Sequence, residues 1–272
     1  MYKTVERVLE ENRVEYFALI PYSACRETNS GIRERMDFTP KSAVIYLLPY
    51  YTGVGENISR YAVSRDYHIA IKRIGEALIS ALGEKYPEAH FAVFGDHSPI
   101  DERHAALISG LGIAGDNGLI INEKYGSYVF VGDILTDLIP DEALGFSPKE
   151  IKRCHGCGAC KRACPTGILG GTGEDCLSAI TQRKGELTDS EAALMLRYNT
   201  AWGCDECQAV CPYNASPKPT PIEFFHRERI ECLTREVLDR MDKDAFKKRA
   251  YSWRGRRVVE RNLEILSHGK KK

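Results

Sequence analysis

The chain has 272 residues, 43% of them hydrophobic, and its 38 Lys and Arg side chains balance 38 Asp and Glu. This length and apolar content suit one large domain or two modest ones with a hydrophobic core. The longest mostly apolar run, residues 43–51, is far shorter than the roughly 20 residues that span a bilayer. The first residues are charged and contain no apolar stretch, so we expect no secretory signal, no membrane attachment and a cytoplasmic location.

The neutral total conceals two halves of opposite charge. Residues 1–150 carry 15 Lys and Arg against 22 Asp and Glu, a balance of −7, whereas residues 151–272 carry 23 against 16, a balance of +7. Residues 247–272 alone hold 10 basic and 2 acidic side chains. Such a basic surface can attract a polyanion, although a solvated helix with a basic tail has the same composition.

The hydrophobic spacing predicts alternating strands and helices over residues 1–147. A helix is expected over 1–12, strands over 14–21 and 42–48, a helix over 65–82 and a short strand over 90–94. A helix over 102–109 follows, and residues 119–122 and 127–135 are expected to form a strand pair joined by a turn. Because the elements alternate without a strict repeat, we expect an α/β or α+β domain.

The rest of the chain divides into two further predicted parts. Residues 148–222 contain few long apolar runs, so we expect bound metal to supply much of their folding energy. The proline-rich stretch 217–221 predicts an extended linker. The predicted parts are thus 1–147, 148–222 and 223–272. The last is expected to be helical and basic and to pack on the body through Phe246, Trp253, Val258, Val259, Leu263 and Leu266.

Ten cysteines are the most informative feature of the composition. Eight fall between Cys154 and Cys211, while Cys25 and Cys232 stand apart and are expected to be plain buried thiols. In a reduced compartment, such a group indicates metal ligation and not a disulfide framework.

The spacing of the eight cysteines indicates two iron–sulfur clusters. Residues 154–165 form the bacterial ferredoxin run C-x2-C-x2-C-x3-C-P, whose fourth cysteine ligates the second of two clusters. Residues 204–212 form a second run, C-x2-C-x3-C-P, and Cys176 is the nearest candidate for the missing eighth ligand. By analogy with crossed ferredoxin ligation, we assign Cys154, Cys157, Cys160 and Cys211 to one [4Fe-4S] cluster and Cys164, Cys176, Cys204 and Cys207 to the other.

Structural zinc is the main alternative for these cysteines, because it also uses paired C-x2-C motifs. Zinc takes four ligands per site, however, and has no use for the C-x2-C-x2-C-x3-C-P spacing of residues 154–165. An iron–sulfur pair moves electrons one at a time, and a ferredoxin alone needs far fewer residues than this chain has. The 147 residues upstream should therefore hold whatever receives or spends the electrons.

Several separate stretches resemble the epoxyqueuosine reductase family. They are YNTAWGCDECQAVCPYN at 198–214, CLSAITQ at 176–182, RYA at 60–62, DYH at 66–68 and YGSY at 125–128. The resemblance runs from about residue 40 to residue 265 and is specific, because these signatures occur in the family's order and extend beyond the cluster ligands.

The resemblance implies a nitroreductase-like, cobalamin-binding α/β domain fused to a ferredoxin-like two-cluster module. The implied activity is reduction of epoxyqueuosine to queuosine at the wobble position of tRNA, with electrons passing from the clusters to cobalt. The implied partners are the anticodon region of tRNA and an electron donor such as ferredoxin or flavodoxin. We expect a monomer, and a flavin is the alternative cofactor.

The resemblance also implies site residues. It places the family's proton-donating aspartate at Asp96, with Asp101 as the runner-up, although Asp96 could instead cap the following helix. The sequence contains no Asp-x-His-x-x-Gly run, so bound cobalamin should be base-off. Two residues expected to contact the corrin have ordinary alternative roles: Tyr61 could pack in the core, and Arg60 could form an ion pair. The expected corrin contacts are Arg60, Tyr61, Ser178 and the loop around Gly115.

Two departures from the family pattern keep other functions open. Asp116 precedes Asn117 where the family usually has Lys, which brings an anion near a phosphate-bearing ligand. Many members continue into helical repeats that grip tRNA, and the basic residues 247–272 could replace them here. The alternatives are a corrinoid or flavin reductase of a small molecule, and an electron-transfer protein whose first domain is a docking module.

Overall fold

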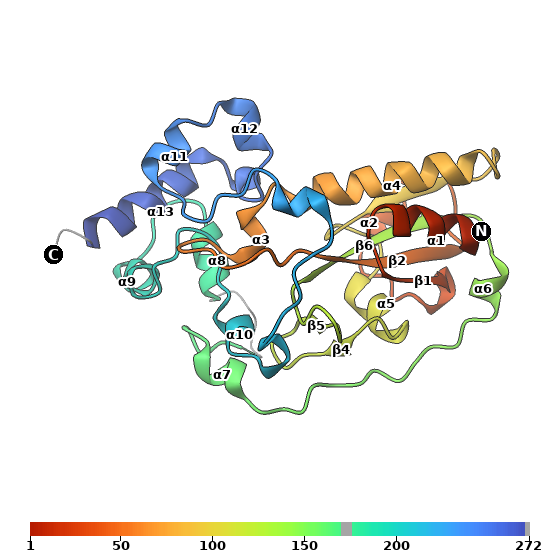
Figure 1. Cartoon of the computed structure of the whole chain (residues 1–272), viewed down its shortest axis with the longest axis horizontal. Coiled ribbons are helices and arrows are strands. Elements are labelled where there is room, and N and C mark those ends of the chain that lie inside the picture. The colour runs from red at the N-terminus through yellow and green to blue at the C-terminus, as the bar shows by residue number, and fades with distance from the viewer. Residues whose placement is uncertain (170–175, 270–272) are drawn as a thin grey trace. The chain divides into compact units, whose positions relative to one another are not determined.

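The computed structural model describes residues 1–169 and 176–269, and it divides into two compact units (Figure 1). Both units are discontinuous in sequence, whereas the predicted parts 1–147, 148–222 and 223–272 follow one another along the chain. The sheet unit comprises Met1–Pro49, His68–Gly115 and Leu119–Cys154. The cysteine unit comprises Tyr50–Tyr67, Asp116–Gly118 and His155–Lys272, within the described ranges.

An antiparallel sheet of four strands forms the centre of the sheet unit. Its strands, in spatial order, are β1 (Tyr16–Pro21), β2 (Ser42–Pro49), β6 (Val129–Thr136) and β3 (Phe91–Phe94). All three pairings are antiparallel, and β1, β2 and β6 lie side by side in Figure 1. All eight residues of β2 are buried, as expected for a continuous apolar run in the middle of a sheet.

Helices cover both faces of β2. Ile45 and Leu47 belong to the apolar cluster that includes α5 (Glu102–Ile108), while the hydroxyl of Tyr46 donates to the carbonyl of Ile71 on α4 (Tyr67–Gly83). Because a Cβ at Gly75 would lie 2.4 Å from a methyl group of Val93, this glycine lets α4 approach β3 closely. The remaining elements are α1 (Tyr2–Glu11), the 3-10 turn η1 (Tyr22–Ala24), α2 (Ser30–Arg33) and α6 (Asp141–Leu144).

One predicted pairing in this unit is wrong. The predicted turn is present, and Asn122 and Gly126 bridge it with two backbone hydrogen bonds. The segments 119–122 and 127–135 nevertheless do not pair as strands, because β5 (Ile120–Ile121) pairs with β4 (Ile113–Ala114) in a second sheet and β6 pairs with β2 and β3. The cause is the side chain of Asn122. Its Oδ1 accepts from the backbone N–H groups of Lys124 and Tyr125, and its Nδ2 donates to the carbonyl of Leu111. These bonds turn the chain away before a ladder can extend.

The cysteine unit consists of short helices and turns, with one longer helix at its end. The longer helix, α13 (Arg256–Gly269), has 14 residues. Among the described residues, no helix is both long and apolar enough to cross a bilayer. The other elements are α3 (Arg60–Val63), α7 (Ala159–Ala163), α8 (Leu177–Gln182), α9 (Asp189–Arg197), α10 (Glu206–Ala209), η2 (Pro212–Asn214), η3 (Glu223–His226), α11 (Arg235–Asp239), α12 (Lys243–Lys247) and η4 (Ser252–Arg254).

Two apolar clusters hold the described part of this unit. The larger surrounds Trp202, which is fully buried, and includes five of the six C-terminal side chains predicted to pack inward. Trp253 is the exception and is 60% exposed, because it lies on η4 with the guanidinium of Arg254 stacked 3.7 Å from its ring centre. The predicted basic side chains of residues 270–272 lie outside the described residues. The smaller cluster is formed by Leu177, Ile180 and Met195.

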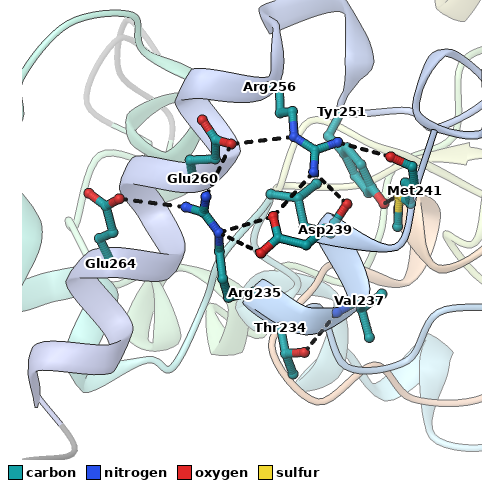
Figure 2. A network of polar contacts seen from close by, with 10 residues as sticks. Thr234, Arg235, Val237, Asp239, Met241, Tyr251, Arg256, Glu260 and Glu264 are labelled. Carbon is teal, nitrogen blue, oxygen red and sulfur yellow. Dashed lines mark hydrogen bonds and ion pairs between the residues drawn. The ribbon is translucent and has the colours of Figure 1, made fainter. Parts of the chain in front are cut away.

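A network of ion pairs joins α11 to α13 (Figure 2). Arg235 contacts Asp239 on its own helix and Glu260 and Glu264 on α13. Arg256 pairs with Asp239 and Glu260, and it also donates to the backbone carbonyls of Leu238 and Met241 at 2.6 and 3.2 Å. Because these side chains are half-exposed, the network contributes to helix docking mainly through the two bonds to backbone carbonyls.

Candidate active site

Four of the predicted cluster cysteines line one cavity in the cysteine unit. The cavity has a volume of about 340 Å³, and the four thiols lie in its wall. Within the described ranges, no three His, Cys, Asp or Glu side chains converge closely enough to hold a single metal ion. These four thiols are the set that the sequence assigns to one of the two clusters: Cys164, Cys176, Cys204 and Cys207.

The surroundings of these thiols shift their pKa values. Burial raises the pKa of Cys204 and of Cys207 to about 12, and the nearby Cys176 adds to both shifts. For Cys164, burial acts in the opposite direction to hydrogen bonds from the side chain and backbone of Thr166, and the net pKa is lowered. Because metal ligation requires thiolates, a bound cation is what would allow the half-buried Cys204 and Cys207 to ionise.

The other four predicted ligands differ in exposure and in position. Cys160 is buried on α7, Cys157 is exposed, and Cys211 is half-buried just before η2. Cys154 is the last residue of the sheet unit, where its N–H donates to the carbonyl of Ala114 at 2.9 Å. The two remaining cysteines of the chain, Cys25 and Cys232, are half-buried.

A carboxylate inside the second cysteine run fixes that run to α3. Asp205 accepts hydrogen bonds from the hydroxyl of Ser59, from the backbone N–H of Arg60 at 2.7 Å and from Arg60 Nη1 at 3.1 Å. The side chains of Arg60 and Asp205 are only 17% and 11% exposed, so this ion pair is largely removed from water. Gly203 has φ +75° and a Cβ there would lie 2.4 Å from the Cβ of Ser59, which requires glycine at this approach.

The predicted corrin contacts all have hydrogen bonds inside the chain. Arg60 holds Asp205, and the hydroxyl of Tyr61 accepts from Trp202 Nε1 at 2.7 Å. Ser178 Oγ accepts from Gln182 Nε2 at 3.1 Å. The N–H of Gly115 donates to the carbonyl of Leu119 at 2.9 Å. Both ordinary alternatives for Arg60 and Tyr61, an ion pair and core packing, are therefore present, and a role toward a cofactor stays a prediction.

The unusual acid at position 116 has a cationic partner. Asp116 lies in the wall of the 340 Å³ cavity, and its carboxylate pairs with Lys161 of α7 at 3.2 Å. The two side chains are 25% and 54% exposed. The negative charge that the sequence introduces beside the cysteines is thus balanced by a lysine from the first cysteine run, a compensation that the sequence analysis did not identify.

Asp96 lies in the loop between β3 and α5 of the sheet unit. It is exposed and has φ +62°, a left-handed conformation that is uncommon for residues other than glycine, although Asp adopts it more readily than most. It does not cap α5: the N-cap is Asp101, whose side chain accepts from the N–H of His104 at 2.8 Å. The capping role that the sequence left open for Asp96 therefore belongs to its runner-up.

Two acids next to this loop, Glu102 and Asp133, are not among the residues predicted from the sequence. Burial is the main cause that raises the pKa of each of them. A signal for Asp133 existed in the sequence, since it is the one charged residue within the apolar run of β6. Glu102 gave no such signal, because an acid in the first turn of a helix is common.

The cysteine segment matches a described family of domains. Residues 153–214 match the family model of a 4Fe-4S double cluster binding domain. This match defines residues 153–214 as an iron–sulfur domain of the double-cluster class.

Relatives identify the family more closely. The epoxyqueuosine reductase of Cyclobacterium marinum is 32% identical over 222 residues, which cover 78% of this chain and 69% of that protein. The enzyme of Listeria monocytogenes is 33% identical over 282 residues, covering 96% of this chain and 72% of that protein. The enzyme of Shewanella oneidensis is 35% identical, but the match covers only 53% of its length. The chain belongs to the epoxyqueuosine reductase family.

Solved structures agree with the fold. Epoxyqueuosine reductase from Streptococcus thermophilus superposes with a TM-score of 0.76 at 21% identity, covering 100% of this chain and 82% of that one. An epoxyqueuosine reductase solved with an epoxyqueuosine-modified tRNA-Tyr stem loop gives 0.77 at 23% identity, covering 99% and 82%. A third, from Bacillus subtilis, has its aspartate catalytic loop swung out of the active site and gives 0.76 at 23% identity, covering 99% and 82%.

Proposed function

We propose that this protein reduces epoxyqueuosine to queuosine in tRNA, with electrons supplied through two [4Fe-4S] clusters and with cobalamin as the group that acts on the epoxide. The observation that carries the proposal is the family relationship, which in the Listeria match extends over 96% of the chain. The double-cluster domain at 153–214 supplies the electron path that such a reduction needs.

The cluster ligands are proposed in the crossed arrangement given by the cysteine runs. One cluster takes the four thiols of the 340 Å³ cavity, a set supported by their shared position in its wall and by the influence of Cys176 on Cys204 and Cys207. A low-potential carrier such as ferredoxin or flavodoxin is the proposed donor. The other cluster takes Cys154, Cys157, Cys160 and Cys211.

Asp96 is the proposed proton donor. The oxygen that leaves an epoxide carbon needs a proton, and an exposed carboxyl on a loop can deliver one. The aspartate catalytic loop of the Bacillus subtilis enzyme supports this role by analogy. The left-handed conformation of Asp96 adds to the support, because backbone strain of this kind is concentrated at functional loops.

Cobalamin is proposed from the family relationship and from polar groups around Arg60. Arg60 lines a cavity of about 170 Å³ beside Cys204, whose wall also contains Ser59, Asn199 and Thr200. Such donors and acceptors fit the carboxamide groups at the edge of a corrin, with Tyr61, Ser178 and Gly115 as further proposed contacts. When bound, cobalamin supplies a low-valent metal for the epoxide carbon, in a domain proposed to be nitroreductase-like.

An anaerobic turnover assay tests the function directly. Reconstituted protein, cobalamin and a low-potential chemical reductant are mixed with an anticodon stem-loop that carries epoxyqueuosine, and the nucleoside is identified by mass spectrometry. Queuosine is the expected product, and the affinity for the stem-loop should fall as salt rises. Absence of queuosine with fully loaded protein contradicts the proposal, and salt-insensitive binding would favour a small-molecule substrate.

A further inference from the structure

Two acids meet beneath the Asp96 loop, inside the sheet unit. Glu102 is the first residue of α5, and Asp133 lies on β6 directly opposite Phe94, two residues before Asp96. Asp133 is 0% exposed. Glu102 Oε1 and Asp133 Oδ1 are both buried, and within the described residues neither receives a hydrogen bond from an N–H or hydroxyl donor.

The two carboxyl groups are close enough for each to shift the pKa of the other, and their buried oxygens have no other donor among the described residues. Two carboxylates offer only acceptors, so a bond between them requires a proton on one of the pair. Burial raises the pKa of both groups, and the charge of Asp133 raises that of Glu102 further. Two carboxyl groups in such proximity titrate as a pair and retain one proton at neutral pH.

Groups on neighbouring elements also favour retention of the proton by Glu102 and Asp133. Burial raises the pKa of Tyr46, which lies on the opposite face of β2, and of Cys25 after η1 above the usual range, so both remain neutral and neither adds a charge near Asp133. Asp96, on the loop itself, is the third group that acts on the pair, and its charge raises the pKa of Glu102. The pair therefore sits among neutral and acidic groups that favour retention of the proton.

The outer oxygens of the pair fasten the loop at two points. The backbone N–H of Asp96 donates to Glu102 Oε2 at 3.1 Å, and Ser98 Oγ donates to Asp133 Oδ2 at 3.1 Å. The N–H of Ile100 donates in turn to Ser98 Oγ at 3.3 Å. One bond thus falls on the residue with the strained φ of +62°, and the other falls two residues later.

We propose that Glu102 and Asp133 share one proton and act as positioning residues that hold Asp96 in its left-handed conformation. Loss of that proton to solvent converts one buried negative charge into two in close proximity. Their repulsion in a poorly solvated site pushes the carboxylates apart and releases the loop. The link to catalysis rests on the proposed role of Asp96, whereas the control of the loop by protonation does not.

Hydrogen exchange of the full-length, cluster-loaded protein tests the control of the loop. After correction for intrinsic exchange, protection of the Asp96 amide should fall at least about tenfold as pH rises through the titration of the pair. The side chain in Glu102→Gln cannot ionise, but its amide can still donate to Asp133 and accept from the Asp96 N–H. Protection of the Asp96 amide in this variant should therefore not change with pH. Glu102→Ala should lose protection at every pH. Asp137→Asn, which removes a half-buried acid paired with His90, is the matched control and should follow the wild type.

Infrared spectroscopy gives a second, independent readout. The wild type at neutral pH should show the carbonyl stretch of a buried protonated carboxyl, and the band should be absent from both Glu102→Gln and Asp133→Asn. The proposal is overturned if both variants keep the band, or if Glu102→Gln loses loop protection with pH as the wild type does. Failure of the proposed function would appear differently, as absent queuosine together with an intact exchange profile.

Discussion

The sheet unit and the cysteine segment, residues 153–214, obtain their order from different sources. In the sheet unit, β2 has eight consecutive buried residues, and aliphatic side chains from α5 and β6 complete its core. In the cysteine segment, the described helices have four to nine residues, the local cluster has Leu177, Ile180 and Met195 as its buried members, and Trp202 is buried in the larger cluster with the C-terminal helices. Polar contacts such as those of Asp205, together with the proposed metal ligands, stabilise the cysteine segment where apolar burial is small.

This difference separates a scaffold from a part whose folding is linked to its cofactor. Burial of apolar surface is non-directional and survives the loss of any single contact at a limited cost. Ligation by thiolates is directional, and removal of one ligand affects every residue that the cluster orders. The comparison therefore predicts that damage to the clusters stays within the cysteine segment.

Removal of one half-buried cluster thiol should have the largest effect. Cys207→Ser should lower the iron content from about eight to about four per chain, because one cluster loses a ligand. Residues 153–214 should become sensitive to protease and reductase activity should disappear, while the sheet unit keeps its exchange protection. Iron analysis and mapped proteolysis measure both results.

Cys25→Ala provides the matched control for this experiment. Cys25 is a half-buried thiol of the sheet unit outside the cysteine runs, so the variant should retain its iron and its activity. Unchanged iron in Cys207→Ser, or zinc in the wild type, would break the comparison between the sheet unit and the cysteine segment.

Removal of the proposed acid should abolish chemistry without changing either core. Asp96→Asn should lower turnover of the epoxyqueuosine stem-loop by about 10²- to 10⁴-fold, the usual contribution of a general acid. Iron content and RNA affinity should not change. Asp101→Asn is the control: Asn is also a good N-cap, so both stability and turnover should be close to the wild type. Equal losses in the two variants would assign Asp96 a structural role.

Substitution of Asp205 tests whether polar contacts order the cysteine segment. Asp205→Ala leaves a largely buried Arg60 without its carboxylate, which should cost on the order of 3 kcal/mol of stability. Asp205→Asn keeps an acceptor for the N–H of Arg60 and should cost less. Thermal unfolding of the cluster-loaded protein measures both. As a control, Glu223→Ala removes an exposed pair with Arg227 and should change little.

The sequence predicts this molecule best where order depends on local pattern. The apolar run of β2, the helical spacing of α4 and the cysteine runs each lie within a short window, and the first two are confirmed. The predicted pairing of 119–122 with 127–135 is wrong, because the side chain of Asn122 redirects the chain by bonds that hydrophobic alternation does not encode.

The parts of the site that sequence did not reveal are long-range pairs. Lys161 neutralises Asp116 across 45 positions, and Glu102 meets Asp133 across 31. Lys161, Asp116 and Glu102 do not differ from ordinary surface charges in their own windows. Only the buried setting of Asp133 in an apolar strand gave a local signal, because an unpaired charge there is costly.

The smallest predicted effect concerns the ion-pair network between α11 and α13 (Figure 2). Arg256→Ala removes two bonds to backbone carbonyls as well as its ion pairs, and should destabilise the cysteine unit by about 1–2 kcal/mol. Arg235→Ala removes only contacts with exposed or half-exposed carboxylates, so its effect should be smaller and should vanish at high salt. Equal losses of unfolding temperature at high salt would show that ion pairs, and not the backbone bonds, dock these helices. If both variants instead leave the cysteine segment intact, its order is separable from the C-terminal helices and depends on the clusters alone.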